Sequence, residues 1–426
     1  MTFVLKGNII YNKNPHTLHL LDNGYLVCQE GLSKGAFGQL PDEFSHLPVV
    51  DYGDKIILPG LIDLHVHAPQ YSIRGMGMDL ELLDWLNRYI FKEESNYSDL
   101  NYARKAYTYF VDDLRDGATS RAVIFATIHT SATILLMEML EGAGLVSFVG
   151  KVNMDRNSPP LLIEESAYKS LLDTKNWIRE ASLRFQKSMP ILTPRFTPSC
   201  SDELMKGLGE LQRKYHLPVQ SHLSENPREI AWVKELSPDS SCYGETYDKF
   251  GLFGGTDAGA IMAHCVWSEG IEEKLLKENN VFVAHCPNSN TNLSSGIAPI
   301  RRFLQEGIHV GLGSDVAGGT QTNIFRAMAD AIQMSKLYWR LVNQNNYALT
   351  VPEALYLGTM GGGQFFGKVG SFEEGYEFDA IVIDDSSFVA PQELTLENRL
   401  ERIIYLAENR HVFEKYIQGN KVKTKD

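Results

Sequence analysis

The feature that most constrains the fold is a series of eight short apolar runs, each followed by a longer stretch. Several runs are almost wholly apolar, as parallel strands buried on both faces require. They occupy residues 55–67, 118–126, 145–153, 190–196, 218–223, 259–265, 280–286 and 309–315. Residues 99–117, 203–216 and 271–280 between them are amphipathic with helical periodicity. Eight β-then-α units predict an α/β fold of the (β/α)8 barrel type, whose active sites lie at the carboxyl ends of the strands.

The two ends of the chain follow another pattern. Residues 1–57 contain short alternating strands separated by turn residues, and residues 366–426 resume that style. We therefore expect both ends to meet in one small composite β-sandwich domain, 1–57 and 366–426, beside a catalytic barrel at 58–365. A chain of 426 residues is long enough for a large barrel and a smaller appendage.

Composition narrows the classes of partner. The hydrophobic fraction of 43% and the charged fraction of 22% are those of a globular protein with a proper core. The formal net charge is −13, and no block of lysine or arginine occurs. These values argue against nucleic acid or an anionic membrane as a partner.

The cysteines and the first residues indicate the compartment. The five cysteines are odd in number and include no C-x-x-C pair, which argues against a disulfide framework and against a cytidine-deaminase-type zinc site. The first twenty residues lack the continuous apolar segment of a signal peptide, and no run approaches the length of a membrane span. We expect a cytoplasmic protein with reduced thiols.

Four residues that close apolar runs form the strongest candidate site: His65, His67, His222 and Asp315. In a strand, residues i and i+2 point to one face, so His65 and His67 can reach one metal ion. Alternatively, the two histidines are unrelated residues of the barrel wall, and Asp315 is a turn former in its glycine-rich segment. Taken together, three imidazoles and a carboxylate favour a divalent metal with one position open for water, which suits hydrolysis of carbon–nitrogen bonds.

Glu225 lies three residues after His222. Asn226, Pro227 and Glu229 form the pattern of an N-cap, a first-turn proline and a capping-box glutamate, so a helix should begin just after Glu225. Glu225 would then lie in the loop above the barrel, where a carboxylate can move protons between water and substrate. The competing interpretation is a glutamate favoured there by the helix dipole.

Two further histidines, His264 and His285, end the sixth and seventh runs in the similar contexts MAHC and VAHC. We assign a catalytic role to His264, which could hydrogen-bond the attacking oxygen, whereas His285 looks structural. A structural role remains the alternative for His264. The fourth run has no lysine at its end, where two-metal barrels of this kind carry a bridging lysine, so we expect a single metal ion.

Several of these segments together resemble the amidohydrolase superfamily. The general marks are PGLIDLHVH, SHLSE, the two AHC strand ends and GLGSD, which cover the barrel from about residue 59 to residue 319. A narrower set is similar to the guanine deaminase branch of that superfamily: HVHAPQYS, LLDWLNRYIFKEE, PRFTPSC, QSHLSEN, AHCPNSNTNLSSG and GLGSDVAGG.

The resemblance implies an activity and its cofactor. It implies hydrolytic deamination of guanine to xanthine and ammonia in a homodimer, with one zinc ion per subunit. Iron(II) accepts the same ligands and is not excluded. The implied metal ligands are His65, His67, His222 and Asp315, and the implied catalytic groups are Glu225 as proton shuttle, Asp315 and His264.

The resemblance also implies that Gln70 and Arg195 hold the purine, that Phe196 lines the pocket and that His222 contacts the substrate. A glutamine amide and a guanidinium both suit the polar edge of a purine. The alternatives are a backbone-capping amide for Gln70, a rim salt bridge for Arg195 and ordinary core packing for Phe196.

Two rival functions stay open at this point. The nearer one is deamination of another amino-heterocycle, such as cytosine or a triazine, on the same scaffold. The farther one is a non-catalytic scaffold protein built on an inactive barrel. Such chains usually lose metal ligands, whereas this sequence keeps every expected group.

Overall fold

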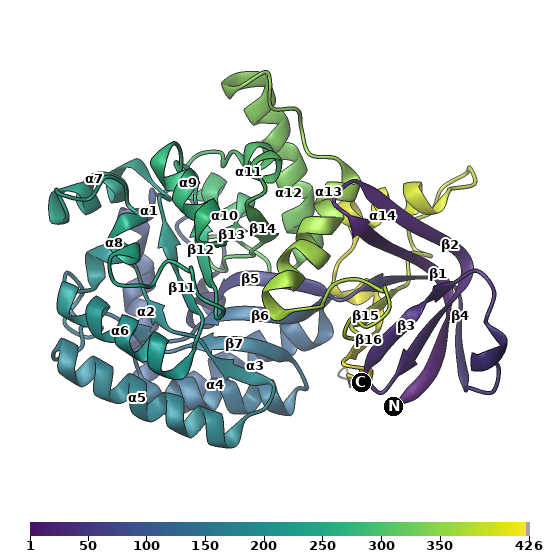
Figure 1. Ribbon diagram of the computed structural model, residues 1–426, viewed down its shortest axis with the longest axis horizontal. Helices are drawn as coiled ribbons and strands as arrows, with labels where there is room; N and C mark the ends of the chain where they lie inside the picture. Colours follow the sequence, from purple (N-terminus) through teal and green to yellow (C-terminus); the bar gives the residue numbers. More distant parts are fainter. Residues whose placement is uncertain (423–426) are drawn as a thin grey trace.

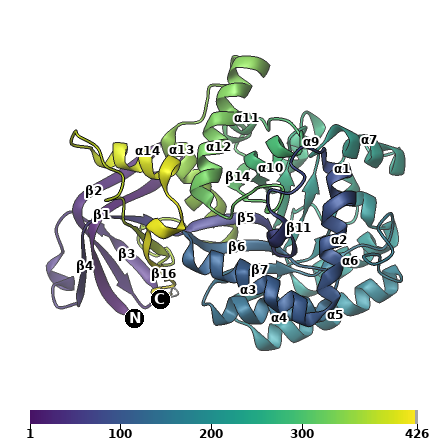
Figure 2. The ribbon, with the colours of Figure 1, turned by 180° about the vertical axis from the view of Figure 1, so that it is seen from behind.

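The computed structural model, which describes residues 1–422, consists of an α/β barrel and a smaller β-rich domain beside it (Figure 1). The first and the last described residues lie in the smaller domain, and the view from behind shows the same two-part arrangement (Figure 2). Within residues 1–422, every helix is too short or too polar to span a bilayer. The barrel carries the candidate residues, so its strands are described first.

The barrel wall is formed by parallel strands, and each of the eight expected runs contributes to it. Residues on β5 and β6 are buried along their whole length, as expected for strands covered on both faces. The strands are β5 (Leu61–His67), β6 (Thr119–Phe125), β7 (Val146–Gly150), β8 (Val152–Asn153), β9 (Ser188–Pro190), β10 (Thr193–Pro194), β11 (Val219–Leu223), β12 (Ala260–His264), β13 (Phe282–His285) and β14 (His309–Leu312).

Two four-stranded sheets, β5-β6-β7-β9 and β11-β12-β13-β14, make up most of the wall. On one side they are joined by a β-bridge between Leu192 and Val219. On the other side the backbone N–H of Asp315 donates to the carbonyl of His65 at 2.8 Å. The barrel therefore closes between β5, which carries His65 and His67, and the end of β14, which is followed by Asp315.

Two of the expected runs are interrupted. The run at residues 55–67 divides at Gly60, because the chain passes there from the terminal sheet into the barrel. A Cβ atom at Gly60 would lie 2.4 Å from the Oγ of Ser120, so only glycine permits this close passage. The run at residues 190–196 is broken into short pieces because Pro190 and Pro194 have no N–H to donate to a neighbouring strand.

Helices cover the outside of the barrel, and the three expected amphipathic helices are confirmed. The covering helices are α3 (Leu100–Asp116), α4 (Thr130–Gly142), α5 (Ala167–Arg184), α6 (Asp202–Tyr215), α7 (Pro227–Leu236), α9 (Ile271–Glu278), α11 (Ile300–Glu306) and α12 (Ile324–Leu337). The predicted capping box of α7 is present, with Asn226 as N-cap and Glu229 bonded back to the N-cap backbone. Glu225 is therefore the last residue before the cap.

The remaining helical elements lie in the loops and in the C-terminal segment. They are η1 (Asp42–Phe44), η2 (Ala68–Ile73), α1 (Leu82–Trp85), the π-helix η3 (Leu86–Ile90), α2 (Phe91–Ser95), η4 (Asn96–Ser98), η5 (Thr197–Ser199), α8 (Glu245–Asp248), α10 (Pro287–Asn292), the π-helices η6 (Tyr338–Val342) and η7 (Leu357–Gly361), α13 (Val351–Tyr356), η8 (Gln364–Phe366), α14 (Leu396–Leu406) and η9 (Asn409–His411). The segment from η2 to α2 follows His67, and it becomes important at the barrel mouth.

The smaller domain unites both ends of the chain, as the sequence predicted. Its strands are β1 (Thr2–Asn14), β2 (Thr17–Gln29), β3 (Leu32–Phe37), β4 (Val49–Pro59), β15 (Ala380–Ile383), β16 (Val412–Ile417) and β17 (Asn420–Lys421). They form one mixed sheet in the order β17-β16-β15-β4-β1-β2-β3, because β4 pairs with β1 on one side and with β15 on the other. Irregularities in register along β1 bend the sheet around its own core. The exact domain limits of the sequence analysis stay a prediction.

A buried ion network joins this sheet to the barrel. The guanidinium of Arg121 on β6 donates to Asp379 at 2.6 Å and to Glu377 at 2.8 Å, just before β15. Arg121 and Asp379 are both buried. Lys415 on β16 is also buried, and its ammonium donates to three backbone carbonyls at the end of α3 and the start of β6.

This network predicts the effect of removing its cation. Replacing Arg121→Met leaves the buried carboxylate of Asp379 uncompensated, so we expect the free energy of unfolding to fall by about 3–5 kcal/mol. Urea denaturation followed by circular dichroism measures the change. A control, Lys169→Met, removes the surface pair of Lys169 with Asp173 and should cost much less. Equal losses in the two variants would contradict a special contribution from the buried network.

Candidate metal and substrate site

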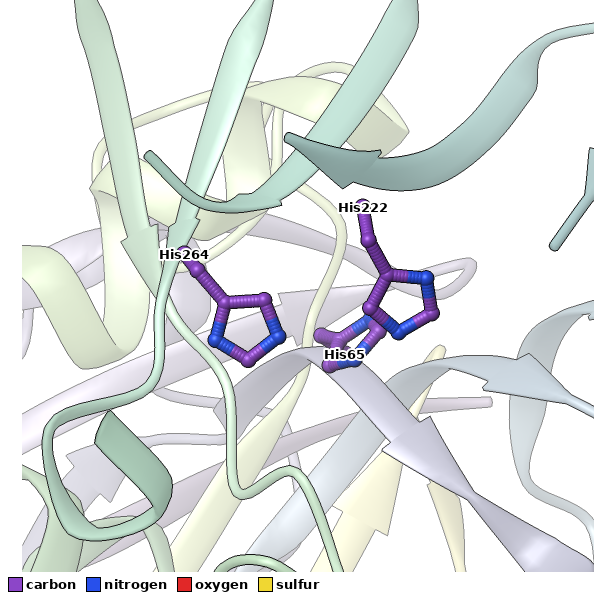
Figure 3. A group of neighbouring side chains, drawn as sticks. All are labelled: His65, His222 and His264. Carbon is purple, nitrogen blue, oxygen red and sulfur yellow. The ribbon is translucent and has the colours of Figure 1, made fainter. Parts of the chain in front are cut away.

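The structure brings the four candidate metal ligands together at the mouth of the barrel. His65 and His67 come from β5, His222 comes from β11, and Asp315 follows β14. The rings of His65, His222 and His264 converge from three different strands (Figure 3). All five side chains of this cluster are buried, or nearly so. Chain segments about 250 residues apart thus meet within one small volume.

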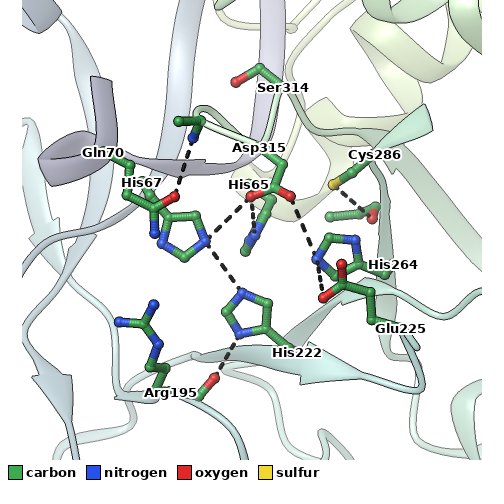
Figure 4. Close-up of polar contacts among 12 residues, drawn as sticks. His65, His67, Gln70, Arg195, His222, Glu225, His264, Cys286, Ser314 and Asp315 are labelled. Atoms are coloured by element: carbon green, nitrogen blue, oxygen red, sulfur yellow. Dashed lines mark hydrogen bonds and ion pairs between the residues drawn. The ribbon is translucent and has the colours of Figure 1, made fainter. Parts of the chain in front are cut away.

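Distances within the cluster are those between atoms that could share an ion (Figure 4). The Oδ1 of Asp315 lies 3.2 Å from the Nε2 of His65 and 3.3 Å from the Nε2 of His67. The Nε2 atoms of His67 and His222 are 3.3 Å apart. His65, His67 and Asp315 form one group of candidate ligand atoms within 4.8 Å of one another, and His65, His222 and His264 form a second.

The hydrogen bonding of His222 fixes which ring nitrogen faces the cluster. Its Nδ1 lies 2.7 Å from the backbone carbonyl of Arg195, which can only accept. The proton of the neutral ring is therefore on Nδ1, and Nε2 turns its lone pair toward His67. This arrangement, in which a backbone carbonyl orients an imidazole, is common among metal-binding histidines.

The backbone is also unusual at the site. The φ angles of Ser224, His264, Cys265 and Asp315 are positive, at 44°, 74°, 48° and 45°. Residues with side chains rarely adopt this conformation, and such residues concentrate at functional sites where surrounding structure enforces them. The local turns aim the side chains of His264 and Asp315 inward from the ends of their strands.

Burial sets the protonation of the histidines. It lowers the pKa of His67 to about 4, and it holds the pKa of His222 well below its ordinary value. Burial alone would raise the pKa of Asp315, but the adjacent imidazoles of His65 and His67 keep it well below its usual range. Neutral imidazoles beside a carboxylate anion are the protonation states that bind a divalent cation.

The donor set therefore fits a metal ion. The Nε2 of His65 is buried and makes no hydrogen bond, although Asp315 is 3.2 Å away. A buried polar atom without a hydrogen bond is costly, and an ion held by both residues would remove that cost. Three imidazole nitrogens and one carboxylate oxygen are ligands that zinc and iron(II) both accept. We conclude that the chain has a buried His/Asp cluster able to bind a divalent metal.

Glu225 lies beside this cluster, in the loop where the sequence placed it. Its Oε1 accepts a hydrogen bond from Ser295 at 3.1 Å, and its Oε2 is 3.4 Å from the Nε2 of His264. Burial, together with the negative charge of Asp315, raises the pKa of Glu225 to about 8. A carboxyl group that holds its proton near neutral pH is suited to proton transfer.

His264 and His285, the histidines of the MAHC and VAHC segments, have different surroundings. His264 is held by Asn290, whose Oδ1 lies 2.8 Å from its Nδ1, and its Nε2 is 3.7 Å from the Oδ2 of Asp315. It therefore faces both candidate catalytic carboxylates. His285 belongs to none of the groups of possible metal ligands found within residues 1–422, and burial lowers its pKa to about 3. Its predicted structural role is consistent with this position.

A pocket lined by both apolar and polar side chains opens beside the cluster, as is usual for small-molecule sites. Its lining includes the predicted substrate residues Gln70, Arg195 and Phe196. The remaining lining residues are His67, Leu82, Trp85, Leu86, His222, Glu225, Glu229, His264, Leu293 and Asp315. The structure thus places every predicted site residue except His65 on the wall of one pocket, and the ring of His65 contacts that of His67 edge to face.

Sequence reasoning missed several residues here. Leu82, Trp85 and Leu86 form an apolar wall from the segment after His67, and Glu94 of the same segment bonds to both Arg195 and Gln70. These residues lie in the motif LLDWLNRYIFKEE, which supported the family resemblance but gave no individual roles. The adjacent carboxylates Glu93 and Glu94 at the end of this motif were the available signal.

Comparison with known proteins identifies the family to which the chain belongs. The chain belongs to the amidohydrolase family, whose model matches residues 56–422. The matched region contains the whole barrel and the C-terminal strands of the smaller domain. The predicted superfamily is therefore confirmed.

Individual relatives show which branch of the amidohydrolase family the chain resembles. The chain is 40% identical to guanine deaminase of Dictyostelium discoideum over 383 residues, 88% of this chain and 84% of that protein. It is 36% identical to guanine deaminase of Mus musculus, covering 99% and 97% of the two chains. It is also similar to the crystal structure of guanine deaminase from C. acetobutylicum with bound guanine in the active site, with a TM-score of 0.96, 46% identity and coverage of 99% and 100%. The predicted resemblance to guanine deaminases is confirmed.

The cluster predicts how metal content depends on single residues. We expect His65→Ala to lower the bound divalent metal of purified protein to below about a tenth of an equivalent, because loss of one ligand breaks the donor set. Inductively coupled plasma mass spectrometry measures this content. The matched control is His309→Ala, since His309 stacks on Phe282 at the start of β14, away from the mouth. Full metal content in the His65 variant would contradict the assignment.

Proposed function

We propose that this chain hydrolyses guanine to xanthine and ammonia. The observation that carries the proposal is the buried His/Asp cluster, which opens into a small pocket with Arg195 and Gln70 on its wall. Similarity to guanine deaminases over nearly the full chain supports guanine over other amino-heterocycles. The ring carbon bearing the amine would face the cluster, and the polar edge of the base would face Arg195 and Gln70.

We propose His65, His67, His222 and Asp315 as ligands of one zinc ion per subunit. Iron(II) accepts the same nitrogen and oxygen donors. Zinc would supply Lewis-acid chemistry that makes a water molecule more acidic at neutral pH. The residues of the chain would perform the proton transfers and hold the base.

Asp315 and Glu225 would divide the proton transfers. Asp315 would accept the proton of the attacking water, and Glu225 would protonate the ring nitrogen next to the reacting carbon. That protonation makes the carbon more electrophilic. Glu225 would then take the proton of the added hydroxyl and deliver it to the amine, so that the carbon–amine bond breaks and ammonia leaves, and the proton held by Asp315 would return to Glu225. The raised pKa of Glu225, about 8 because of burial, suits a group that must give up and regain a proton.

His264 would stabilise the oxygen that develops negative charge. Its Nε2 lies 3.4 Å from Glu225 and 3.7 Å from Asp315, so all three groups point at one small region. Preorganised donors of this kind are worth about 3–4 kcal/mol in other enzymes. Phe196 and His222 would pack against the purine, because both side chains line the pocket.

We further infer a homodimer and a cytoplasmic location, both from the resemblance to guanine deaminases and from the sequence. Sedimentation velocity of the purified protein measures the assembly directly. A single monomeric species at micromolar concentration would contradict the dimer.

The function itself is tested by ultraviolet assay of the metal-loaded protein. We expect guanine to be consumed with stoichiometric appearance of xanthine, because the pocket and cluster suit a flat amino-purine. Cytosine and an amino-triazine serve as competing substrates under the same conditions. Activity on either of these without activity on guanine would overturn the proposal in favour of the rival deaminase.

The proton shuttle is tested by Glu225→Gln. This isosteric change should leave metal content unchanged yet lower kcat by about 10²–10⁴, because the acid and base function is lost. Glu235→Gln, at an exposed position on α7, is the matched control and should keep wild-type kcat. Near wild-type turnover of the Glu225 variant would show that another group transfers the proton.

A further inference from the structure

Glu94 is a buried carboxylate at the mouth of the barrel. The proposed reaction gives this residue no role. It belongs to α2, which follows the π-helix η3 over the pocket, and only 4% of its surface is exposed. A carboxylate so deeply buried is stable only when its charge is compensated by close partners. Its partners therefore indicate what it does.

Both oxygens of Glu94 are used, and each binds one of the two predicted base-holding residues. Oε2 accepts from the Nη1 of Arg195 at 2.5 Å, and Oε1 accepts from the Nε2 of Gln70 at 2.9 Å. Arg195 and Gln70 are themselves buried. One carboxylate thus connects two side chains that follow different strands of the barrel, Gln70 in η2 after β5 and Arg195 just after β10.

The contact fixes the orientation of the Gln70 amide. A carboxylate only accepts, so the NH2 group of Gln70 must face Glu94. At its other end, the Oε1 of Gln70 accepts from the backbone N–H of Ala317 at 3.2 Å. The amide is held at both ends and cannot rotate without placing donor against donor. Gln70 therefore has its second amide hydrogen to offer a ligand, and its oxygen is already engaged.

The contact has a parallel effect on Arg195. Glu94 compensates its positive charge and holds one end of the guanidinium, and Phe91 lies 5.4 Å from its centre. A guanidinium has five N–H donors and no acceptor, so the nitrogens not bound to Glu94 can only donate. Together, Arg195 and Gln70 present a surface of hydrogen-bond donors toward the pocket.

Such a surface matches one edge of guanine. The O6 and N7 atoms of guanine are both acceptors, whereas adenine presents an amino group in place of O6. A site built to donate to a carbonyl rejects an analogue without it, because the buried donors are left without partners.

We propose that Glu94 is a positioning residue that makes this wall of the pocket donate only, and thereby selects purines with a carbonyl at C6. The inference rests on the proposed function, since it concerns how the same pocket distinguishes guanine from related amino-purines. Glu94 does not contact the reacting atoms and acts through Arg195 and Gln70.

The test compares guanine with 2-aminopurine, which keeps the amine at C2 but lacks the oxygen at C6 and the proton on N1. In Glu94→Gln, an amide N–H replaces one acceptor, so Arg195 or Gln70 loses its fixed orientation. We expect kcat/KM for guanine to fall about 10–100-fold, as for loss of one charge-assisted hydrogen bond. Ammonia release from 2-aminopurine should fall much less, since that substrate has no oxygen to bind. The ratio of the two kcat/KM values should therefore drop at least about tenfold.

This ratio separates positioning from simple loss of structure. Both substrates are measured on the same preparation, so a smaller fraction of folded or metal-loaded enzyme cancels. The matched control is Glu93→Gln. Glu93 is buried on the same helix but binds the hydroxyls of Ser72 and Tyr102, and it should keep the wild-type ratio. Glu94→Asp gives the same test in a variant that retains charge but cannot reach both partners.

The outcomes are distinguishable. An unchanged ratio in the Glu94 variants, with active wild-type enzyme, overturns the positioning role and leaves the proposed function intact. An equal drop of the ratio in Glu93→Gln also overturns it, because the effect would then belong to the segment as a whole. A wild-type protein inactive on both purines would instead overturn the proposed function, and this inference with it.

Discussion

The barrel mouth depends on one electrostatic constraint: ionisable side chains are buried there in close contact and must compensate one another. Three imidazoles and the carboxylate of Asp315 lie within hydrogen-bond distances but satisfy one another incompletely, and His65 keeps an unbonded nitrogen. A cation would complete this set. In the absence of a cation, apolar residues of similar volume would make a more stable core than these ionisable groups do. The strained backbone at His264 and Asp315 supports the same interpretation, because such conformations persist only where surrounding structure enforces them.

A second group of buried polar side chains, in which opposite charges lie in contact, lies on another wall of the pocket. Glu94, Arg195 and Gln70 form a chain of hydrogen bonds that uses both oxygens of Glu94 and leaves further N–H groups of Arg195 and Gln70 for a ligand. In the proposed mechanism the two halves of the pocket differ in chemistry: the His/Asp cluster and Glu225 would transfer protons, whereas the Glu94 group would offer oriented donors. This division would let one small cavity both hold a base and activate water beside it, because each half is ordered before the substrate arrives.

Much of this arrangement could be predicted from local sequence. The eight apolar runs gave the barrel, and the capping pattern at Asn226 located Glu225 just before helix α7. Gly60 and the prolines at 190 and 194 were less informative, because their effect depends on how closely neighbouring strands approach. The β-rich ends were expected to join, but the pairing of β4 with both β1 and β15 in one sheet is a long-range contact that local patterning does not encode.

The sequence by itself determined the fold class, the residues that end the barrel strands and, through family resemblance, the proposed metal ligands and chemistry. These follow from periodicity and residue type, which act over a few neighbouring positions. Only the tertiary structure decided that Glu94 binds Arg195 and Gln70, that Asn290 holds His264 and that Ser295 holds Glu225. Those partners are up to 101 residues apart, and a carboxylate or an amide has no role until folding fixes which donors surround it.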